Sequence, residues 1–259
     1  MSKRTKDKQL TKKFFSVENK NAPFNYVEAY KKLCTNIEFI TATNKCKKLM
    51  ITSTLANEGK TNVSVNLCLT LSGYGKKVCL VECDLRRPTI HRFINSKRHS
   101  KGVTDVLTGD IKLDDAINKV GDTNLHILLS GTIPPNPSEL LASDNMKNMI
   151  DELEKRFDYV IFDTPPVFLV TDAVALGRFV DGAVYVVRYN STDKNIVIKA
   201  KKSLEATGVK IFGAIFSNFN ERTAGTYSGY SRYSYSYYGH YGYGGYDKPV
   251  KEAEKEETK

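Results

Sequence analysis

The sequence has no apolar run close to the 18 or so residues needed to cross a bilayer, and its lysine-rich beginning lacks the apolar stretch of a signal peptide. We therefore expect a cytoplasmic protein. The five cysteines lack the spacing of metal ligands, and several stand in apolar segments, where a reduced thiol serves as a small hydrophobic side chain. Neither disulfides nor a metal cluster is predicted for Cys34, Cys46, Cys68, Cys79 and Cys83.

Leucine, isoleucine and valine are missing from residues 227–246, which consist mostly of tyrosine, glycine and serine. This segment cannot build a core, its glycines raise the entropy cost of ordering, and only Arg232 carries a fixed charge, so we predict a disordered tail. Composition alone favours a sticky segment that stacks on nucleic acid or self-associates. The nine tyrosines of the tail are Tyr227, Tyr230, Tyr233, Tyr235, Tyr237, Tyr238, Tyr241, Tyr243 and Tyr246.

Length and charge predict one domain between two polar ends. The 259 residues leave about 200 for a single α/β domain. The expected division is a basic arm over 1–24, the domain over 25–222 and the tail over 223–259. The net charge of +10 comes partly from the arm, which suits nucleic acid or the inner face of a membrane, or is simply solvated. Its first cations are Lys3, Arg4, Lys6, Lys8, Lys12 and Lys13.

Apolar strands alternate with amphipathic helices along the domain. The expected strands are 47–53, 77–82, 125–130, 159–162, 183–188 and 210–216. The expected helices are 61–73, 145–157, 171–179 and 193–207. This alternation predicts an α/β fold of the P-loop type, a mainly parallel sheet with helices on both faces and the ligand site at the carboxyl ends of the strands.

The turn after the first predicted strand ends in Gly59-Lys60-Thr61, as a phosphate-binding loop does, although Thr54 replaces its usual first glycine. Backbone N–H groups in such a loop converge on phosphate oxygens at a helix N-terminus. Lys60 is expected to reach the β and γ phosphates, and the Thr61 hydroxyl to bind Mg²⁺. Asn57 tolerates positive φ. The predicted ATP-binding residues are Asn57, Glu58, Gly59, Lys60, Thr61 and Asn62.

Carboxylates end two further strands. Glu82 and Asp84 point to the same side of an extended chain, so one is expected to serve Mg²⁺ or its waters and the other the attacking hydroxyl. The apolar strand that ends in Asp163 is the usual source of another Mg²⁺ carboxylate. Surface ion pairs at polar strand ends are the structural alternative. The predicted catalytic residues are Lys60, Glu82, Asp84 and Asp163, and Mg²⁺ is expected near Thr61 and Asp163 with one of the carboxylates of Glu82 and Asp84.

Three short segments give the chain a family resemblance. They are Asp-x-Arg-Arg-Pro at 84–88, Pro-Pro-Asn-Pro-Ser-Glu-Leu at 134–140 and Asp-Thr-Pro-Pro at 163–166. With the tyrosine tail, they closely resemble the bacterial tyrosine kinases that regulate capsular and exopolysaccharide synthesis, in their stand-alone cytoplasmic form. The likeness runs from about residue 25 to 220 and resumes in the tail.

The resemblance implies a protein-tyrosine kinase that uses ATP and Mg²⁺ and phosphorylates its own tail. It also implies that Lys60 contacts the phosphates and that Glu82 lies nearest the acceptor phenol. The Mg²⁺ ligands that it implies are Thr61, Asp84 and Asp163. The implied partners are a membrane adaptor of the polysaccharide co-polymerase type, further copies in a ring and a tyrosine phosphatase. The kinase would then lie at the inner face of the membrane through its adaptor, without nucleic acid.

Two departures from the family pattern concern the acceptor and the ring. Glu82 stands where aspartate is usual, which keeps the charge but lengthens the side chain. The family's Glu-x-x-Arg-x-x-Arg, which supplies subunit contacts, appears as Glu28, Lys31 and Cys34. Lysine lacks the two-pronged guanidinium, and cysteine keeps no charge. Glu28 and Lys31 remain the predicted oligomer contacts, in a weakened motif.

Other readings remain for the whole chain and for one motif. A MinD/ParA-type switch ATPase shares the loop and the fold, but its signature lysine is missing at Thr54, Leu55 and Ala56. A tyrosine-rich nucleic-acid binder with a decayed nucleotide site is the non-enzymatic reading. For the proline-rich segment we expect a structural role, with Asn136 or Ser138 capping a helix.

Overall fold

The computed structural model describes residues 16–94, 96 and 100–219. The chain divides into two units, Met1–Asn218 and Phe219–Lys259, and all the helices and strands below belong to the first. The tail tyrosines and the basic residues of positions 1–15 lie outside the described residues.

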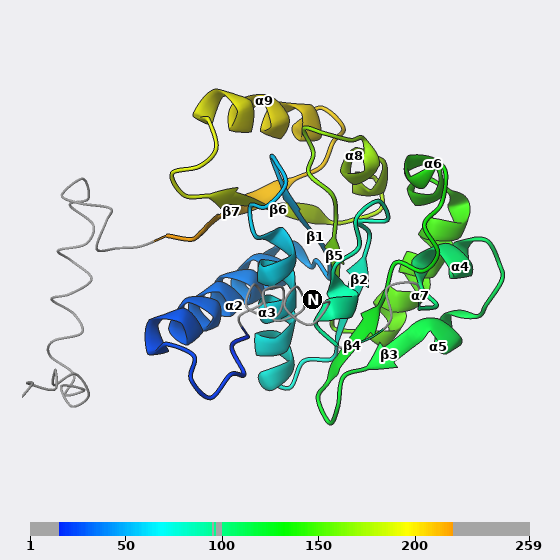
Figure 1. The fold of residues 1–259 in the computed structure, drawn as a ribbon, viewed down its shortest axis with the longest axis horizontal. Helices are drawn as coiled ribbons and strands as arrows, with labels where there is room; N and C mark the ends of the chain where they lie inside the picture. The colour runs from blue at the N-terminus through cyan, green and yellow to red at the C-terminus, as the bar shows by residue number, and fades with distance from the viewer. Residues whose placement is uncertain (1–15, 95, 97–99, 220–259) are drawn as a thin grey trace, which may run out of the picture. The chain divides into compact units, whose positions relative to one another are not determined.

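A seven-stranded sheet forms the centre of the first unit (Figure 1). Its strands are β1 Lys48–Ser53, β2 Val78–Glu82, β3 Ile117–Lys119, β4 Leu125–Leu128, β5 Tyr159–Asp163, β6 Gly182–Arg188 and β7 Ile211–Ser217. They lie in the order β3-β4-β2-β5-β1-β6-β7, and only β3 runs antiparallel to its neighbour. All six predicted strands are present, and the fold class is confirmed. The short edge strand β3 escaped prediction.

Helices pack on both faces of the sheet. One face carries α2 Phe24–Asn44 and α3 Lys60–Gly73. The other carries α4 Val103–Leu107, α5 Leu113–Ala116, α6 Pro137–Leu141, α7 Asp144–Arg156, α8 Asp172–Gly177 and α9 Lys194–Glu205. A 3-10 turn, Ile90–Arg92, follows β2. The four predicted helices correspond to α3, α7, α8 and α9.

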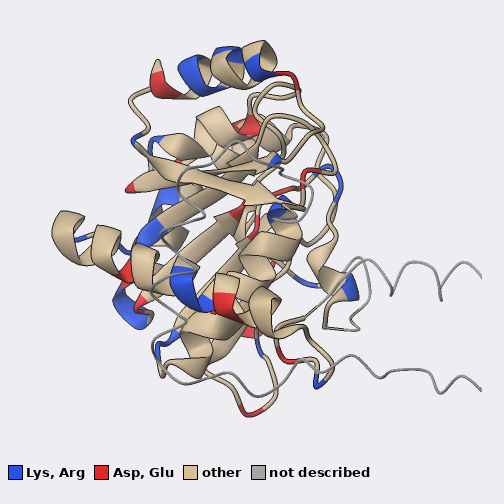
Figure 2. Ribbon diagram, turned by 90° about the vertical axis from the view of Figure 1, so that its left-hand side faces the viewer, with Lys and Arg blue, Asp and Glu red and all other residues tan. Residues whose placement is uncertain are grey.

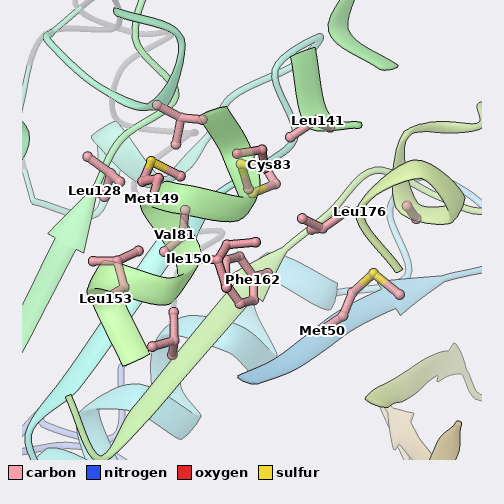
Figure 3. Close-up of a cluster of buried hydrophobic side chains, with 14 of the residues drawn as sticks. Met50, Val81, Cys83, Leu128, Leu141, Met149, Ile150, Leu153, Phe162 and Leu176 are labelled. Atoms are coloured by element: carbon pink, nitrogen blue, oxygen red, sulfur yellow. The ribbon is translucent and has the colours of Figure 1, made fainter. Parts of the chain in front are cut away.

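Two hydrophobic clusters hold the layers together, one on each side of the sheet. Neighbouring residues of β1 alternate between them, with Met50 in one and Leu49 and Ile51 in the other. Figure 3 shows Met50 in the first cluster with Phe162 of β5 and Ile150 of α7. Strands covered on both faces read as nearly continuous apolar runs, which is why the central strands were predictable.

Polar side chains cap two of the helices, and charged residues lie on the exposed face of α9. The Ser143 hydroxyl accepts the N–H of Met146 at 3.2 Å and caps α7. Asp193 caps α9 in the same way. The lysines of α9 remain on the solvent side, where Figure 2 shows basic positions along the uppermost helix. No helix among the described residues is long and apolar enough to cross a membrane.

All five cysteines are free and buried, whereas the sequence indicated an apolar setting for only several of them. Cys79 and Cys83 belong to one hydrophobic cluster, and Cys34 and Cys68 to the other. Burial raises the pKa of the Cys68 and Cys83 thiols well above the usual value. They therefore act as small hydrophobic side chains.

Candidate active site

The loop between β1 and α3 has the backbone of a phosphate-binding loop. Asn57 has φ 65° and Gly59 has φ 91°, so the positive φ predicted for Asn57 is confirmed. A Cβ on Gly59 would meet Ser217 at an ordinary contact distance of 3.4 Å, so the positive φ is what favours glycine at this position. The α3 helix begins at Lys60, so the N–H groups of its first turn have no partner within the helix. An anion binds well at such an end.

Side chains from β6, β7 and the β6–α9 connection brace this loop. The carboxylate of Glu58 is buried, accepts the Leu55 N–H at 2.7 Å and accepts a hydrogen bond from the Thr192 hydroxyl. The Ser217 hydroxyl donates to the Glu58 carbonyl at 2.5 Å. Arg188 donates to the carbonyl of Asn57 at 3.0 Å. The loop is therefore held both by its own Leu55–Glu58 hydrogen bond and by residues more than 130 positions away.

Thr54 occupies the position of the usual first glycine without disturbing the loop. Its side chain is fully buried, and its hydroxyl lies 3.2 Å from the hydroxyl of Tyr185 in β6. A buried hydroxyl without a partner is costly, so this pair explains how threonine is tolerated here.

Lys60 lies in a strongly negative environment. Its ammonium is 3.1 Å from Oδ2 of Asp84, and the other oxygen of Asp84 accepts the Arg87 N–H at 3.0 Å. Burial alone lowers the pKa of Lys60, but Asp163 and Asp84 outweigh it and raise the pKa. Lys60 therefore stays protonated, and its ammonium is available to a phosphate bound at the loop.

Asp163 is the buried centre of the site. Its Oδ2 accepts the Thr61 hydroxyl at 2.7 Å, and its Oδ1 accepts the Ser64 hydroxyl at 3.0 Å. Burial raises its pKa, while Lys60 and Thr61 oppose the shift. The fold therefore brings together Lys60, Thr61, Asp84 and Asp163, as predicted from three separate loops.

Glu82 is occupied by backbone groups. Its side chain is buried at the end of β2, where Oε1 accepts the N–H of Thr89 at 2.5 Å and of Ile90 at 2.7 Å. Oε2 accepts the Ser130 N–H at 3.2 Å. Burial raises the pKa of Glu82 to about 7, although the N–H groups of Ile90 and Thr89 lower it. Glu82 thus ties its own loop to the end of β4.

The oxygen groups of the site suit Mg²⁺. Thr61 supplies a hydroxyl, and Asp84 and Asp163 supply carboxylates. The described residues contain no group of three or more His, Cys, Asp or Glu side chains able to hold a metal by themselves. Because Mg²⁺ is commonly held by one or two carboxylates together with substrate phosphates, this sparse oxygen set fits it.

The remaining predicted residues contact α2 or lie on it. The Asn62 side chain accepts hydrogen bonds from Tyr26 at 3.1 Å and Tyr30 at 3.3 Å. Glu28 and Lys31 form an ion pair with each other at 2.7 Å. Cys34, one turn after Lys31, is fully buried against α3, with its Sγ 3.9 Å from the Leu67 carbonyl.

The expected capping of α6 is wrong. Asn136 stands at the cap position, but it makes no side-chain cap and donates to Glu139 at 2.5 Å instead. The Ser138 hydroxyl donates at 2.5 Å to Asp172, which Arg86 also contacts. Pro137 takes the first helical turn, where a missing N–H costs nothing.

Several partners in the site could not be predicted from the sequence. Tyr185, Thr192 and Asp172 carry no local motif, and each meets the loops from a distant element. The sequence shows Asp172 only as an acidic residue at the start of a predicted helix. Acidic residues are common there in any helix, so this pattern does not indicate a contact with Arg86.

Comparison with known proteins places this geometry in a family. A family model described as AAA domain matches residues 46–186. Tyrosine-protein kinase YwqD of Bacillus subtilis (strain 168) is 40% identical over 190 residues, which is 73% of this chain and 80% of that protein. Tyrosine-protein kinase CpsD of Streptococcus pneumoniae is 36% identical over 193 residues, 74% of this chain and 84% of the relative.

Solved structures agree. The kinase domain of Escherichia coli tyrosine kinase ETK superposes with a TM-score of 0.73 at 33% identity and covers 78% of this chain and 79% of its own. The septum site-determining protein MinD of Pyrococcus horikoshii OT3, complexed with Mg-ADP, reaches 0.58 at 26% identity, covering 68% and 72%. The fold is shared with MinD, but the closer likeness is to kinases. The chain therefore belongs to the bacterial tyrosine kinases built on a nucleotide-binding P-loop fold, and it is a protein-tyrosine kinase.

Proposed function

We propose that this kinase transfers the γ-phosphoryl group of ATP to tyrosines of its own C-terminal cluster and to those of neighbouring copies. The supporting observation is the convergence of two contacts at the carboxyl edge of the sheet, Lys60 with Asp84 at 3.1 Å and Thr61 with Asp163 at 2.7 Å. The acceptor tyrosines lie outside the described residues, so their role rests on composition and on the family.

Phosphate and metal binding are assigned to separate groups. The loop N–H groups from Asn57 to Asn62 and the Lys60 ammonium bind the phosphates. Thr61, Asp84 and Asp163 hold Mg²⁺, which neutralises charge on the phosphate oxygens when bound. Lys60 of the Lys60–Asp84 pair belongs to the phosphate-binding groups, because its ammonium is a cation. Asp84 belongs to the metal-binding groups, because its carboxylate is an oxygen ligand.

Glu82 is proposed to act near the acceptor phenol through the loop that it holds. Its oxygens already accept the N–H groups of Thr89, Ile90 and Ser130. Phosphoryl transfer depends mainly on alignment and charge neutralisation, so a side chain that fixes the loop beside Asp84 contributes to alignment.

The biological role proposed for the kinase is control of capsular or exopolysaccharide synthesis and export. A membrane adaptor of the polysaccharide co-polymerase type would hold it at the inner face of the membrane, and a tyrosine phosphatase would reverse its action. Ring assembly through Glu28 and Lys31 is part of the proposal. One solved structure that resembles this chain, at a TM-score of 0.73 and 30% identity, is the chimerical protein CapA2B2.

The kinase and the switch ATPase make opposite predictions for labelled ATP. The full chain is incubated with γ-labelled ATP and Mg²⁺, with and without the cytoplasmic segment of the adaptor, and both released phosphate and phosphotyrosine are measured. The proposal expects labelled tyrosine that disappears in Lys60→Met. Steady hydrolysis with the adaptor segment present and no labelled tyrosine would favour the switch ATPase.

The polysaccharide role is tested in cells. Replacing the chromosomal copy with Lys60→Met should change the amount or length of cell-surface polysaccharide while the protein level stays the same. An unaltered polysaccharide in cells shown to lack phosphotyrosine on this protein would contradict the proposed role.

A further inference from the structure

One cluster of side chains joins three segments of the chain. Arg86 follows β2, Ser138 lies in α6, and Asp172 is the first residue of α8. The Arg86 guanidinium donates to both oxygens of Asp172, from Nε at 2.8 Å and from Nη2 at 2.9 Å. The Ser138 hydroxyl donates to the same carboxylate at 2.5 Å. We call these three residues the Arg86 cluster.

The Arg86 cluster is a firm anchor because one partner is buried. The Asp172 side chain is 0% exposed, whereas that of Arg86 is 42% exposed. A two-pronged contact fixes the plane of the guanidinium as well as its position. If Arg86 moved away, a buried carboxylate would lose its cation, which is strongly unfavourable. The chain at residue 86 is therefore fixed to α6 and α8.

This anchor lies two residues from Asp84. Leu85, between them, is fully buried, and the Arg87 N–H donates to Oδ1 of Asp84 at 3.0 Å. The opposite oxygen of Asp84 meets Lys60 at 3.1 Å. The turn is thus held on one side by the Arg86 cluster, while its carboxylate extends to the phosphate-binding loop on the other.

We propose that the Arg86 cluster is a positioning device that holds the Asp84 carboxylate where Mg²⁺ and the nucleotide bind together. The proposal rests on the proposed function, in which Asp84 is a metal ligand. None of the three residues is assigned a contact with ATP or the acceptor. The cluster also gives a role to Ser138 of the proline-rich segment, a residue that has no role in the proposed reaction.

The test compares nucleotide binding with and without the metal. The dissociation constant of a fluorescent ADP analogue is measured for the full chain in excess Mg²⁺ and in EDTA, and the ratio is the Mg²⁺ gain. Arg86→Lys keeps the charge but loses the two-pronged contact. It should reduce the gain roughly 10-fold, as loss of groups that orient metal ligands commonly does, with the EDTA value within about twofold of the unaltered chain.

Two more variants sharpen the result. Arg87→Lys is the matched control, because it makes the same change at the next residue, whose side chain forms no ion pair within the described part of the chain. Its gain should stay within about twofold of the unaltered chain. Combining Arg86→Lys with Asp172→Asn should reduce the gain by less than the product of the single effects, since both act on one contact.

The outcomes separate positioning from stability. Thermal unfolding first establishes that each variant is folded. A Mg²⁺ gain in Arg86→Lys equal to that of the unaltered chain, or an equal loss of binding in both buffers, would overturn the proposal. If the unaltered chain shows no Mg²⁺ gain, the metal role of Asp84 is wrong and this proposal falls with it. Phosphotyrosine formation, scored separately, tests the proposed function.

Discussion

The carboxyl edge of the sheet and the exposed side of α2 differ in how their charged residues are partnered. At the edge, Lys60 meets Asp84 and Thr61 meets Asp163, contacts that join residues 24 and 102 positions apart. On α2, Glu28 meets a residue only three positions away. A contact between distant segments depends on the whole fold, whereas an ion pair within one helical turn depends on that turn alone.

The family motifs are also retained to different degrees in the two regions. The loop motifs are nearly intact at the edge, where each side chain has several partners. On α2 the motif is reduced to Glu28 and Lys31, and Cys34 has become part of the core. We therefore expect substitutions at the carboxyl edge to have large effects and substitutions on α2 to have small ones.

The largest effect is expected for Asp163→Asn. The amide keeps the shape of the side chain but removes the charge assigned to the metal, so kcat/KM for tyrosine phosphorylation should fall by roughly 100-fold or more. Burial raises the pKa of Asp163, so at pH 8 the neutral variant should unfold at the same temperature or higher. Kinase assays and thermal unfolding check both. Ser64→Ala, which removes one hydrogen bond to this carboxylate, is the milder control.

Glu82 should make the stability of the protein depend on pH. Its folded pKa of about 7 lies above the unfolded value of about 4.5, so the folded state holds an extra proton between these values. The stabilisation that Glu82 contributes should therefore be fully present below pH 4.5 and be lost as the pH rises through 7, a loss on the order of 3 kcal/mol in the free energy of unfolding.

Comparison with Glu82→Gln isolates that contribution, because glutamine does not titrate. Urea unfolding at pH 5 and pH 8 should show the stability difference between the unaltered chain and the variant moving in favour of glutamine as pH rises. Parallel stability curves across this range would contradict the assigned pKa.

A smaller effect is expected for Tyr185→Phe. It removes the hydroxyl that lies 3.2 Å from the buried Thr54 hydroxyl, and the unpaired group should cost about 1 to 2 kcal/mol in urea unfolding. Tyr74→Phe is the matched control on an exposed residue and should leave stability unchanged. An equal change in the free energy of unfolding for both variants would contradict a stabilising contact between Tyr185 and Thr54.

The smallest effect belongs to Glu28→Gln. Its ion pair with Lys31 is partly exposed and local, so the unfolding temperature should change by less than about 2 °C. Light scattering of the same variant tests the proposed ring, which should dissociate at a higher protein concentration than the ring of the unaltered chain. A large loss of monomer stability in Glu28→Gln would contradict the expectation that substitutions on α2 have smaller effects than substitutions at the carboxyl edge.

The parts of the molecule that the sequence predicted are those with a local signal. The central strands are apolar on both faces, and Gly59-Lys60-Thr61 follows one of them directly, so the position of the loop could be inferred. The loop carboxylates Asp84 and Asp163 followed from the same logic. The positive φ of Asn57 also has a local signal, because asparagine tolerates that conformation better than most residue types.

The parts that escaped prediction are contacts between distant segments. Ser138 was expected to cap its own helix, but the fold places Asp172 within reach, and a buried carboxylate is a stronger attractor than a helix end. Glu82 was expected to face the acceptor, and its contacts with Thr89, Ile90 and Ser130 depend on the packing of β2 beside β4. No spacing rule encodes such partners.

Mass-spectrometric mapping decides whether the site at the carboxyl edge phosphorylates the tail tyrosines, as we propose. The full chain and Lys60→Met are each incubated with ATP, Mg²⁺ and the adaptor segment, digested and mapped. We expect phosphotyrosine within residues 227–246 of the unaltered chain and none in the variant. Phosphotyrosine absent from that segment in the unaltered chain, or present equally in Lys60→Met, would contradict it.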